Sequence, residues 1–225
     1  FVACIRARRE GTFHVDLQLR PYGKNGSMAV ALDAFRRYFA PDGEAWAYER
    51  QALVKLRPIA GDARLGEKIV ALRDQYVYQG GWFDVAAMRA MRERQIRHLV
   101  TGGTLNTKFS PGGLVDLEYL VQALQIIHGG QYPAVRETHT GRALDALAEV
   151  GVLSSEHYTR LREALIFLRR LINALRVVRG NARDLTVPSM DSEEFAFLAR
   201  RLGYANDLGS LRQDLLRHTG NVQEL

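Results

Sequence analysis

The chain has 225 residues, of which 47% are hydrophobic and 25% charged, and these values are ordinary for a globular protein with a sizeable core. Its formal net charge of +6 and its pI of about 9.7 favour anionic partners such as nucleotides or phosphorylated groups. Cys4 is the only cysteine, which excludes an intrachain disulfide and favours a reducing compartment, the cytoplasm. No apolar run approaches the roughly 18 residues of a membrane span, and the arginines are dispersed, so we expect neither a membrane nor a nucleic acid as partner.

Residues 13–26 read FHVDLQLRPYGKNG and begin with the alternation of a half-buried strand. The apolar side chains share one face, which leaves Asp16 and Arg20 on the other. Four residues along a strand separate these two by roughly 13 Å, so they can address different ends of a phosphate-bearing ligand. A solvated strand face is the alternative. Lys24 lies at the tip of the PYGKNG turn that follows.

Beyond this turn the pattern is helical. We predict a short amphipathic helix that stops before Pro41, a second helix over about residues 44–56, and two more within residues 63–100, separated by Gly80 and Gly81. The glycine-rich segment TGGTLNTKFSPGG, which begins at residue 101, is the clearest interruption, and we place a boundary there between two domains, residues 1–101 and 102–225.

The second of these regions is predicted to be wholly helical. Its first helix, over about residues 114–127, is apolar nearly all round, which indicates a buried central helix. We expect buried side chains at Leu114, Leu117, Val121, Leu124, Leu165, Leu168 and Ile172. Polar residues interrupt the central helix at Glu118, Gln122 and Gln125, which we interpret as a buried hydrogen-bonded stripe.

Arginines recur every seven residues at Arg162, Arg169 and Arg176, and they form either a solvated face or a partner-binding face. Gly112 and Gly113 precede the central helix. They form either a cradle for an anion at the helix N-terminus or a tight turn into the helix, and Asp116 favours the turn because it would repel an anion.

Nucleotidyl transfer needs carboxylates that hold Mg²⁺ against a triphosphate, and Asp16 alone is a weak signal for such a site. The nearest acid pairs, Asp116/Glu118 and Asp191/Glu193, lie at predicted helix starts, where acids complement the helix dipole. A complete metal site is therefore not expected in this chain.

Three blocks, VDLQLRPYGKNG, EAWAYERQALVKLRPIAGD and KFSPGGLVDLEYLVQALQIIHGG, resemble in order and spacing the glutamine synthetase adenylyltransferase family, also known as glutamate–ammonia-ligase adenylyltransferase. The resemblance covers most of the chain. It implies a polymerase-beta-type nucleotidyltransferase domain of the α+β class, of which residues 1–101 are a remnant, followed by an antiparallel helical bundle over residues 102–225. The chain is therefore predicted to be mainly α and to lack the upstream part of the nucleotidyltransferase domain.

The resemblance implies an enzyme that uses ATP and Mg²⁺ to attach AMP to a tyrosine of glutamine synthetase, or phosphate to remove it with release of ADP. The segments LRPYG, ERQALVKLRPIAGD and IIHGGQYPAVR are more similar to the adenylyl-removing half. Glutamine synthetase and a PII-type signalling protein are the implied partners. The alternative is a non-catalytic helical module that docks a regulatory protein through its basic face. The 225-residue chain alone is expected to be inactive.

The resemblance also assigns site residues. Asp16 matches the third metal-binding carboxylate of the family, whose first two are expected upstream of this chain. Gln18 stands where the family has an arginine, which puts part of the phosphate contact in doubt, whereas Arg20 keeps its place. Lys55 and Arg57 fall beside the implied active site.

Arg20, Lys24, Lys55 and Arg57 are therefore expected to contact phosphates. For Lys55 and Arg57 a solvated helix face is the alternative.

Overall fold

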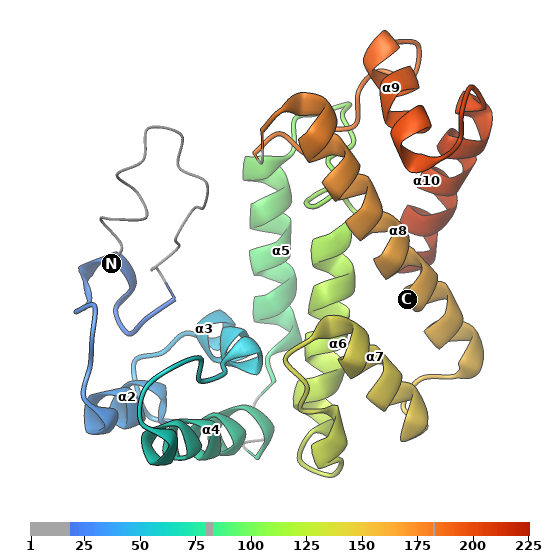
Figure 1. Cartoon of the computed structure of the whole chain (residues 1–225). Helices are drawn as coiled ribbons and strands as arrows, with labels where there is room; N and C mark the ends of the chain where they lie inside the picture. The colour runs from blue at the N-terminus through green and yellow to red at the C-terminus, as the bar shows by residue number, and fades with distance from the viewer. Residues whose placement is uncertain (1–18, 80–82, 182) are drawn as a thin grey trace. The chain divides into compact units, whose positions relative to one another are not determined.

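The computed structural model describes residues 19–79, 83–181 and 183–225 (Figure 1). It divides into two compact units, Phe1–Gly80 and Gly81–Leu225. The predicted domain division at residues 101 and 102 stays a prediction, because it concerns the extent of the nucleotidyltransferase domain.

The described residues are mainly helical, which confirms the predicted class. They contain no strand, and their one isolated β-bridge joins Asn106 and Thr186. The strand expected around Asp16 lies outside the described residues apart from its end, so the polymerase-beta remnant stays a prediction. Within the described ranges, no helix combines the length and apolar character that crossing a bilayer requires.

The first unit is built from short helices. Its described elements are η1 (Gly23–Asn25), α2 (Leu32–Phe39), α3 (Ala47–Ala52), η2 (Leu53–Lys55) and α4 (Ala63–Tyr78). The prediction of one continuous helix over about residues 44–56 is therefore wrong, because α3 starts later and is followed by a 3₁₀ turn. Its start is fixed by Glu49, which accepts a hydrogen bond from the backbone N–H of Trp46 at 2.9 Å. Pro58 biases Arg57 away from helical geometry, so the helical segment does not continue past this point.

A small core joins α2, η2 and α4. It consists of the buried side chains Tyr38, Phe39, Leu53, Val54, Leu72, Tyr76 and Val77. Two buried arginines brace the loops around it. Arg50 donates to the carbonyls of Ala40 and Pro41 at 2.5 and 3.3 Å, and Arg73 donates to the carbonyl of Leu56 at 3.1 Å. Backbone groups that no helix can pair are thus satisfied by side chains.

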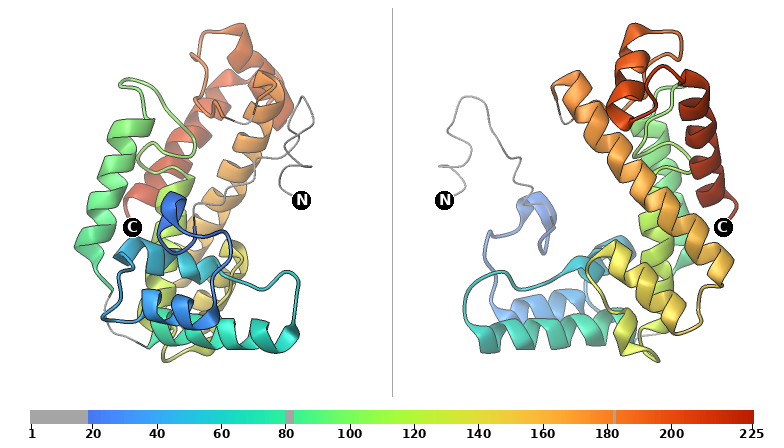
Figure 2. Two further views of the ribbon diagram at one scale, coloured as in Figure 1. Left: turned by 90° about the vertical axis from the view of Figure 1, so that its left-hand side faces the viewer. Right: turned by 45° about the vertical axis from the view of Figure 1, so that its right-hand side comes forward.

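The second unit is a helical bundle around one long helix. Its described elements are α5 (Val85–Leu99), α6 (Leu114–His128), η3 (Pro133–Val135), α7 (Thr140–Glu149), α8 (Ser155–Arg179), α9 (Glu193–Leu202) and α10 (Leu208–Gln223). Helix α8 packs against α6, α7, α9 and α10, and the two views of Figure 2 show it running through the unit. Ser154 caps its start through a bond to the N–H of His157, and Gly180 ends it with a φ of 65°.

The predicted core of this unit is confirmed with one exception. Leu117, Val121, Leu165 and Leu168 are almost wholly buried, and Leu114 and Ile172 are also buried. Leu124 is only partly buried, although it still packs against the cluster.

The polar stripe of α6 is buried only in part. Gln125 lies in the interior and donates to the carbonyls of Val135 and Glu137 at 2.6 and 2.7 Å. Gln122 is also buried. Glu118 instead is partly exposed and lies 4.0 Å from Arg169.

Candidate functional site

A pocket of about 270 Å³ in the first unit is lined by Arg20, Lys55 and Arg57. These are three of the four described side chains that the sequence predicts for phosphate contact. The rest of the lining is mostly apolar and consists of Leu19, Phe39, Glu49, Ala52, Leu53 and Leu56. A pocket with apolar walls and several cations suits a small anion, or an anionic molecule that also has an apolar part.

Arg20 also has a structural task. Its Nε donates to the carbonyl of Gly26 at 3.0 Å, and its Nη2 lies 3.4 Å from the carbonyl of Lys24. The backbone N–H of Gly23 returns a bond to the Arg20 carbonyl at 2.8 Å. The guanidinium therefore closes the turn that follows the predicted strand. Lys24 is exposed on η1 and does not line the pocket.

Lys55 and Arg57 flank Leu56, whose backbone carbonyl accepts a hydrogen bond from a side chain of α4. η2 ends at Lys55, and Leu56 is extended, with a ψ of 129°. Arg73 of α4 donates to the Leu56 carbonyl at 3.1 Å, and the same guanidinium contacts Asp74 at 2.7 and 2.6 Å. Arg57 is exposed and makes no hydrogen bond or ion pair with the described residues. Its charge is therefore available to a ligand.

Glu49 is the one carboxylate in the lining of this pocket, and its oxygens already have partners. Both accept from the hydroxyl of Tyr38 at 3.0 Å, and Oε2 also accepts from the N–H of Trp46. Arg50, its neighbour in sequence, binds loop carbonyls on another side, because adjacent residues of a helix do not face each other. Glu49 shapes the pocket wall.

The described residues do not assemble a magnesium site. They contain no group of three or more His, Cys, Asp or Glu side chains that could hold a metal ion. Asp16 and Gln18 lie outside the described residues, so their predicted roles stay predictions.

The glycines before α6 form a tight turn, the alternative that the position of Asp116 favoured in the sequence. The N–H of Gly112 donates to Oδ2 of Asp116 at 2.7 Å, so the carboxylate occupies the place that an anion would take. Arg92 of α5 contacts Oδ1 of the same carboxylate and donates to the carbonyls of Phe109 and Ser110 at 2.7 and 3.2 Å. No local pattern links Arg92 to Asp116, and the sequence analysis missed this pair.

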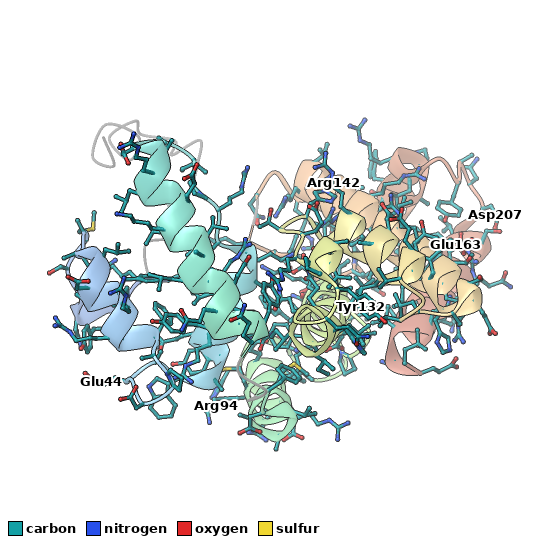
Figure 3. All side chains as sticks on the ribbon, turned by 90° about the horizontal axis from the view of Figure 1, so that it is seen from below. Glu44, Arg94, Tyr132, Arg142, Glu163 and Asp207 are labelled. Carbon is teal, nitrogen blue, oxygen red and sulfur yellow. The ribbon has the colours of Figure 1, made fainter. Side chains whose placement is uncertain are left out.

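A second polar cluster lies between α8 and α10, and it was also missed. The hydroxyl of Tyr204 contacts Oδ2 of Asp214. Burial, followed by this hydrogen bond, raises the pKa of Tyr204 to about 12. Arg217 donates to the other oxygen of Asp214 at 2.8 Å and lies 3.6 Å from Glu163. Figure 3 labels Glu163 on α8. These contacts join α10 to α8 and to the segment between α9 and α10, and their residues do not line the pocket of Arg20, Lys55 and Arg57.

His218, the next residue of α10, is buried and stacks on the ring of Phe167 at 4.5 Å. Its Nε2 accepts from Arg217 at 3.1 Å. Burial lowers the pKa of His218, and the charge of Arg217 lowers it further. Both effects favour the neutral imidazole, which packs on Phe167.

The arginine stripe of α8 is partly paired. Arg162 lies 3.2 Å from Asp145, and Arg169 lies 4.0 Å from Glu118. Arg176 is exposed and has no ion pair within the described ranges. These pairs leave less free charge for a partner than the sequence pattern suggested.

Two family models match successive parts of the chain. The glutamate-ammonia ligase adenylyltransferase model matches residues 6–71, and the GlnD PII-uridylyltransferase model matches residues 86–225. The two matches follow the division into compact units, since one ends before residue 80 and the other begins after it.

Curated relatives span both units. A bifunctional glutamine synthetase adenylyltransferase/adenylyl-removing enzyme of Stenotrophomonas maltophilia is 39% identical over 196 residues, which are 85% of this chain and 20% of that protein. The enzyme of the same name from Streptomyces avermitilis is 37% identical over 212 residues, 91% of this chain and 21% of that protein. That from Mycobacterium avium is 36% identical over 176 residues, 76% of this chain and 17% of that protein.

The chain thus spans about a fifth of the length of the curated relatives it matches. The family models cover successive parts of the chain, and relatives of one name run through both units at more than a third identity. The chain belongs to the glutamine synthetase adenylyltransferase family.

Proposed function

We propose that this chain is part of an enzyme that adds AMP to a tyrosine of glutamine synthetase and removes it by phosphorolysis. The observation that carries the proposal is the pocket lined by Arg20, Lys55 and Arg57, because it lies within the segment that the adenylyltransferase family model matches. The relatives' names describe both activities. We favour the adenylyl-removing half, on the sequence blocks around this pocket and after α6.

In the removing direction, an oxygen of inorganic phosphate attacks the phosphorus of tyrosyl-AMP. The new P–O bond yields ADP, the bond to the tyrosine oxygen breaks, and that oxygen takes up a proton. Arg20, Lys55 and Arg57 are proposed to hold the phosphate and offset the charge that gathers on its oxygens. Lys24 is proposed to contact phosphate from the η1 turn, outside this pocket.

Asp16 is proposed as a ligand of Mg²⁺, which when bound would neutralise phosphate charge. The described residues do not form a metal site of their own. Glutamine synthetase as substrate, a PII-type regulator as partner and a cytoplasmic location belong to the same proposal.

The test is the release of ADP from adenylylated glutamine synthetase by the full-length protein, in the presence and absence of phosphate. Lys55→Gln and Arg57→Gln are each expected to raise the KM for phosphate about tenfold or more, because each removes a cation from the pocket. Matched controls are Lys68→Gln and Arg64→Gln, which change exposed cations of α4 outside this pocket.

Equal phosphate dependence in all four variants would remove the pocket from the active site. Absence of both AMP transfer and AMP release in the full-length protein would favour the docking module instead. The isolated 225-residue chain is expected to show neither activity.

A further inference from the structure

Four aromatic side chains line a second pocket of the first unit, and no step proposed above uses it. The pocket has a volume of about 350 Å³ and is lined by Tyr22, Gly23, Asn25, Tyr38, Glu44, Trp46, Tyr48 and Glu49. Three of the four rings are well exposed: Trp46 by 67%, Tyr22 by 54% and Tyr48 by 42%. Single exposed aromatic residues are common on protein surfaces, but several of them around one hollow mark a binding site.

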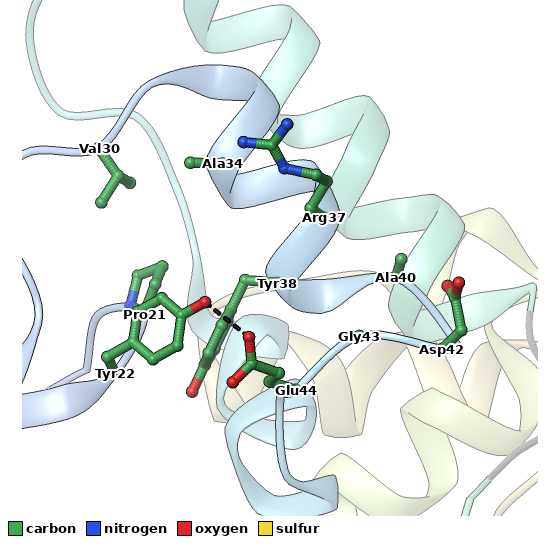
Figure 4. A pocket seen from close by; sticks show the side chains of 10 residues that line it. All are labelled: Pro21, Tyr22, Val30, Ala34, Arg37, Tyr38, Ala40, Asp42, Gly43 and Glu44. Carbon is green, nitrogen blue, oxygen red and sulfur yellow. Dashed lines mark hydrogen bonds between the residues drawn. The ribbon is translucent and has the colours of Figure 1, made fainter.

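Hydrogen bonds to two carboxylates hold the rings in place. The hydroxyl of Tyr22 donates to Oε1 of Glu44 at 2.8 Å, and Figure 4 shows this bond beside the ring of Tyr38. Tyr38 in turn donates to Glu49, and the Tyr22 and Tyr38 ring centroids lie 4.7 Å apart. The pocket is therefore formed before any ligand arrives.

Tyr22 also has a strained backbone. Its φ of 62° lies in the left-handed region, which is unusual for a bulky residue. Such conformations persist where the surrounding structure imposes them and are frequent at binding sites. Here the conformation places an aromatic ring at the pocket instead of the glycine or asparagine that the turn would favour.

The charge of the lining selects the ligand. The eight residues include the carboxylates of Glu44 and Glu49 and no basic side chain. Oε2 of Glu44 accepts no hydrogen bond from the described residues. Aromatic faces attract cations, and a carboxylate at their edge adds a charged hydrogen-bond acceptor. An anionic nucleotide would meet two carboxylates in this lining, whereas the nearby cation Arg37 belongs to the adjoining pocket.

The spacing of the rings also excludes a base stacked between Trp46 and Tyr48. Their centroids lie 6.2 Å apart with an angle of 27° between the planes, which is the range of direct aromatic contact. The rings offer one shared wall, on which a flat cation can lie.

We propose that this pocket binds an arginine side chain of a partner protein, whose guanidinium stacks on the aromatic wall and bonds to Glu44. Arginine fits better than lysine because its planar fork can lie on a ring and bond a carboxylate at the same time. Arg37 lines the adjoining pocket that shares Tyr22, Tyr38 and Glu44, and among the described residues it lies over no aromatic ring. The site does not depend on the proposed catalytic activity.

The test uses N-acetyl-arginine amide as the probe and N-acetyl-citrulline amide as its uncharged isostere. The 225-residue chain with Trp82→Phe is titrated while the fluorescence of Trp46 is followed at constant ionic strength. The arginine probe is expected to saturate with a millimolar Kd, and citrulline to bind about tenfold more weakly. Glu44→Gln and Tyr48→Leu should each weaken the arginine probe about fivefold, whereas Glu67→Gln, at an exposed carboxylate of α4, should not.

Equal binding of the citrulline probe would overturn the proposal, because the site would then recognise the shape of the side chain and not its charge. So would a response that does not saturate by about 100 mM, unchanged binding in a folded Glu44→Gln protein, or displacement of the probe by AMP. Circular dichroism checks the fold of each variant. If Tyr48→Leu does not fold, Glu44→Gln alone decides.

Discussion

Arg92 of α5 and Asp116 of α6 are joined by a salt bridge across 24 residues of sequence. The guanidinium is nearly buried, and it also binds two carbonyls of the loop between the helices. The carboxylate meanwhile accepts from the N–H of Gly112. One ion pair thus fixes how α5, the glycine-rich loop and α6 are joined.

Replacing Arg92 by Leu should destabilise the second unit by about 2–4 kcal/mol, because it leaves Asp116 and two loop carbonyls without their donor. Chemical denaturation followed by circular dichroism measures the change. Arg97→Leu is the matched control, since Arg97 lies 4.0 Å from Glu93 on the exposed face of the same helix and should cost less than about 0.5 kcal/mol. Similar losses in the two variants would contradict the structural role of Arg92.

Gly112→Ala should be more harmful than Gly151→Ala. Both glycines have a positive φ, 75° and 76°, so both substitutions strain the backbone by about 1 kcal/mol. A methyl group at Gly112 would in addition lie 2.2 Å from the carbonyl oxygen of Thr219, whereas nothing lies within 4 Å of one at Gly151. We expect a total loss above about 2 kcal/mol for Gly112→Ala, from denaturant midpoints. Equal midpoints would mean that α10 moves aside freely.

His218 should make the bundle less stable in mild acid. Its pKa in the folded protein lies below the ordinary value of 6.5, because burial and Arg217 oppose the charged form, although Asp214 and Glu163 favour it. The unfolded chain therefore binds more protons in this range, and stability is full above about pH 6.5 and falls below it. The denaturation midpoint of wild type, compared with that of His218→Gln between about pH 7.5 and 5, isolates this effect. Parallel profiles would exclude His218 as the cause.

Asp16→Asn in the full-length enzyme should lower turnover by about a thousandfold or more, because a neutral amide no longer offsets charge at the proposed metal. Arg20→Lys should have a milder effect: lysine keeps the charge but loses the planar fork, which here also closes the turn to Gly26. Steady-state kinetics on the purified variants measure both effects, and circular dichroism confirms the fold. Turnover of Asp16→Asn within a few-fold of wild type would show that Asp16 binds no metal.

Local patterns predicted the helical class and most of the core of the second unit, because helical periodicity depends on residues that are close in sequence. Ser154 and Gly180 bound α8 as their chemistry requires, and the apolar stripe around Leu165 and Leu168 is buried. The later start of α3 depends instead on the hydrogen bond from the N–H of Trp46 to Glu49.

The positions of the candidate site residues could be predicted in part, whereas their contact with phosphate stays a prediction. Lys55 and Arg57 do share a pocket with Arg20, although only the family resemblance placed them together. Lys24 lies at the exposed tip of the turn and does not line the pocket. The aromatic pocket was missed because its rings come from two separate segments, around Tyr22 and around Trp46, and no periodicity joins them.

The clamp between Arg73 and the Leu56 carbonyl has a consequence for binding entropy. The backbone between Lys55 and Arg57 is pinned by a buried side chain of α4, so it does not have to be ordered when an anion arrives. The conformational cost of this segment is met during folding, and only the side-chain rotamers remain to be fixed on binding. The pocket is thus pre-organised at its backbone and adaptable at its charged side chains, a combination that suits the proposed exchange of phosphate and ADP.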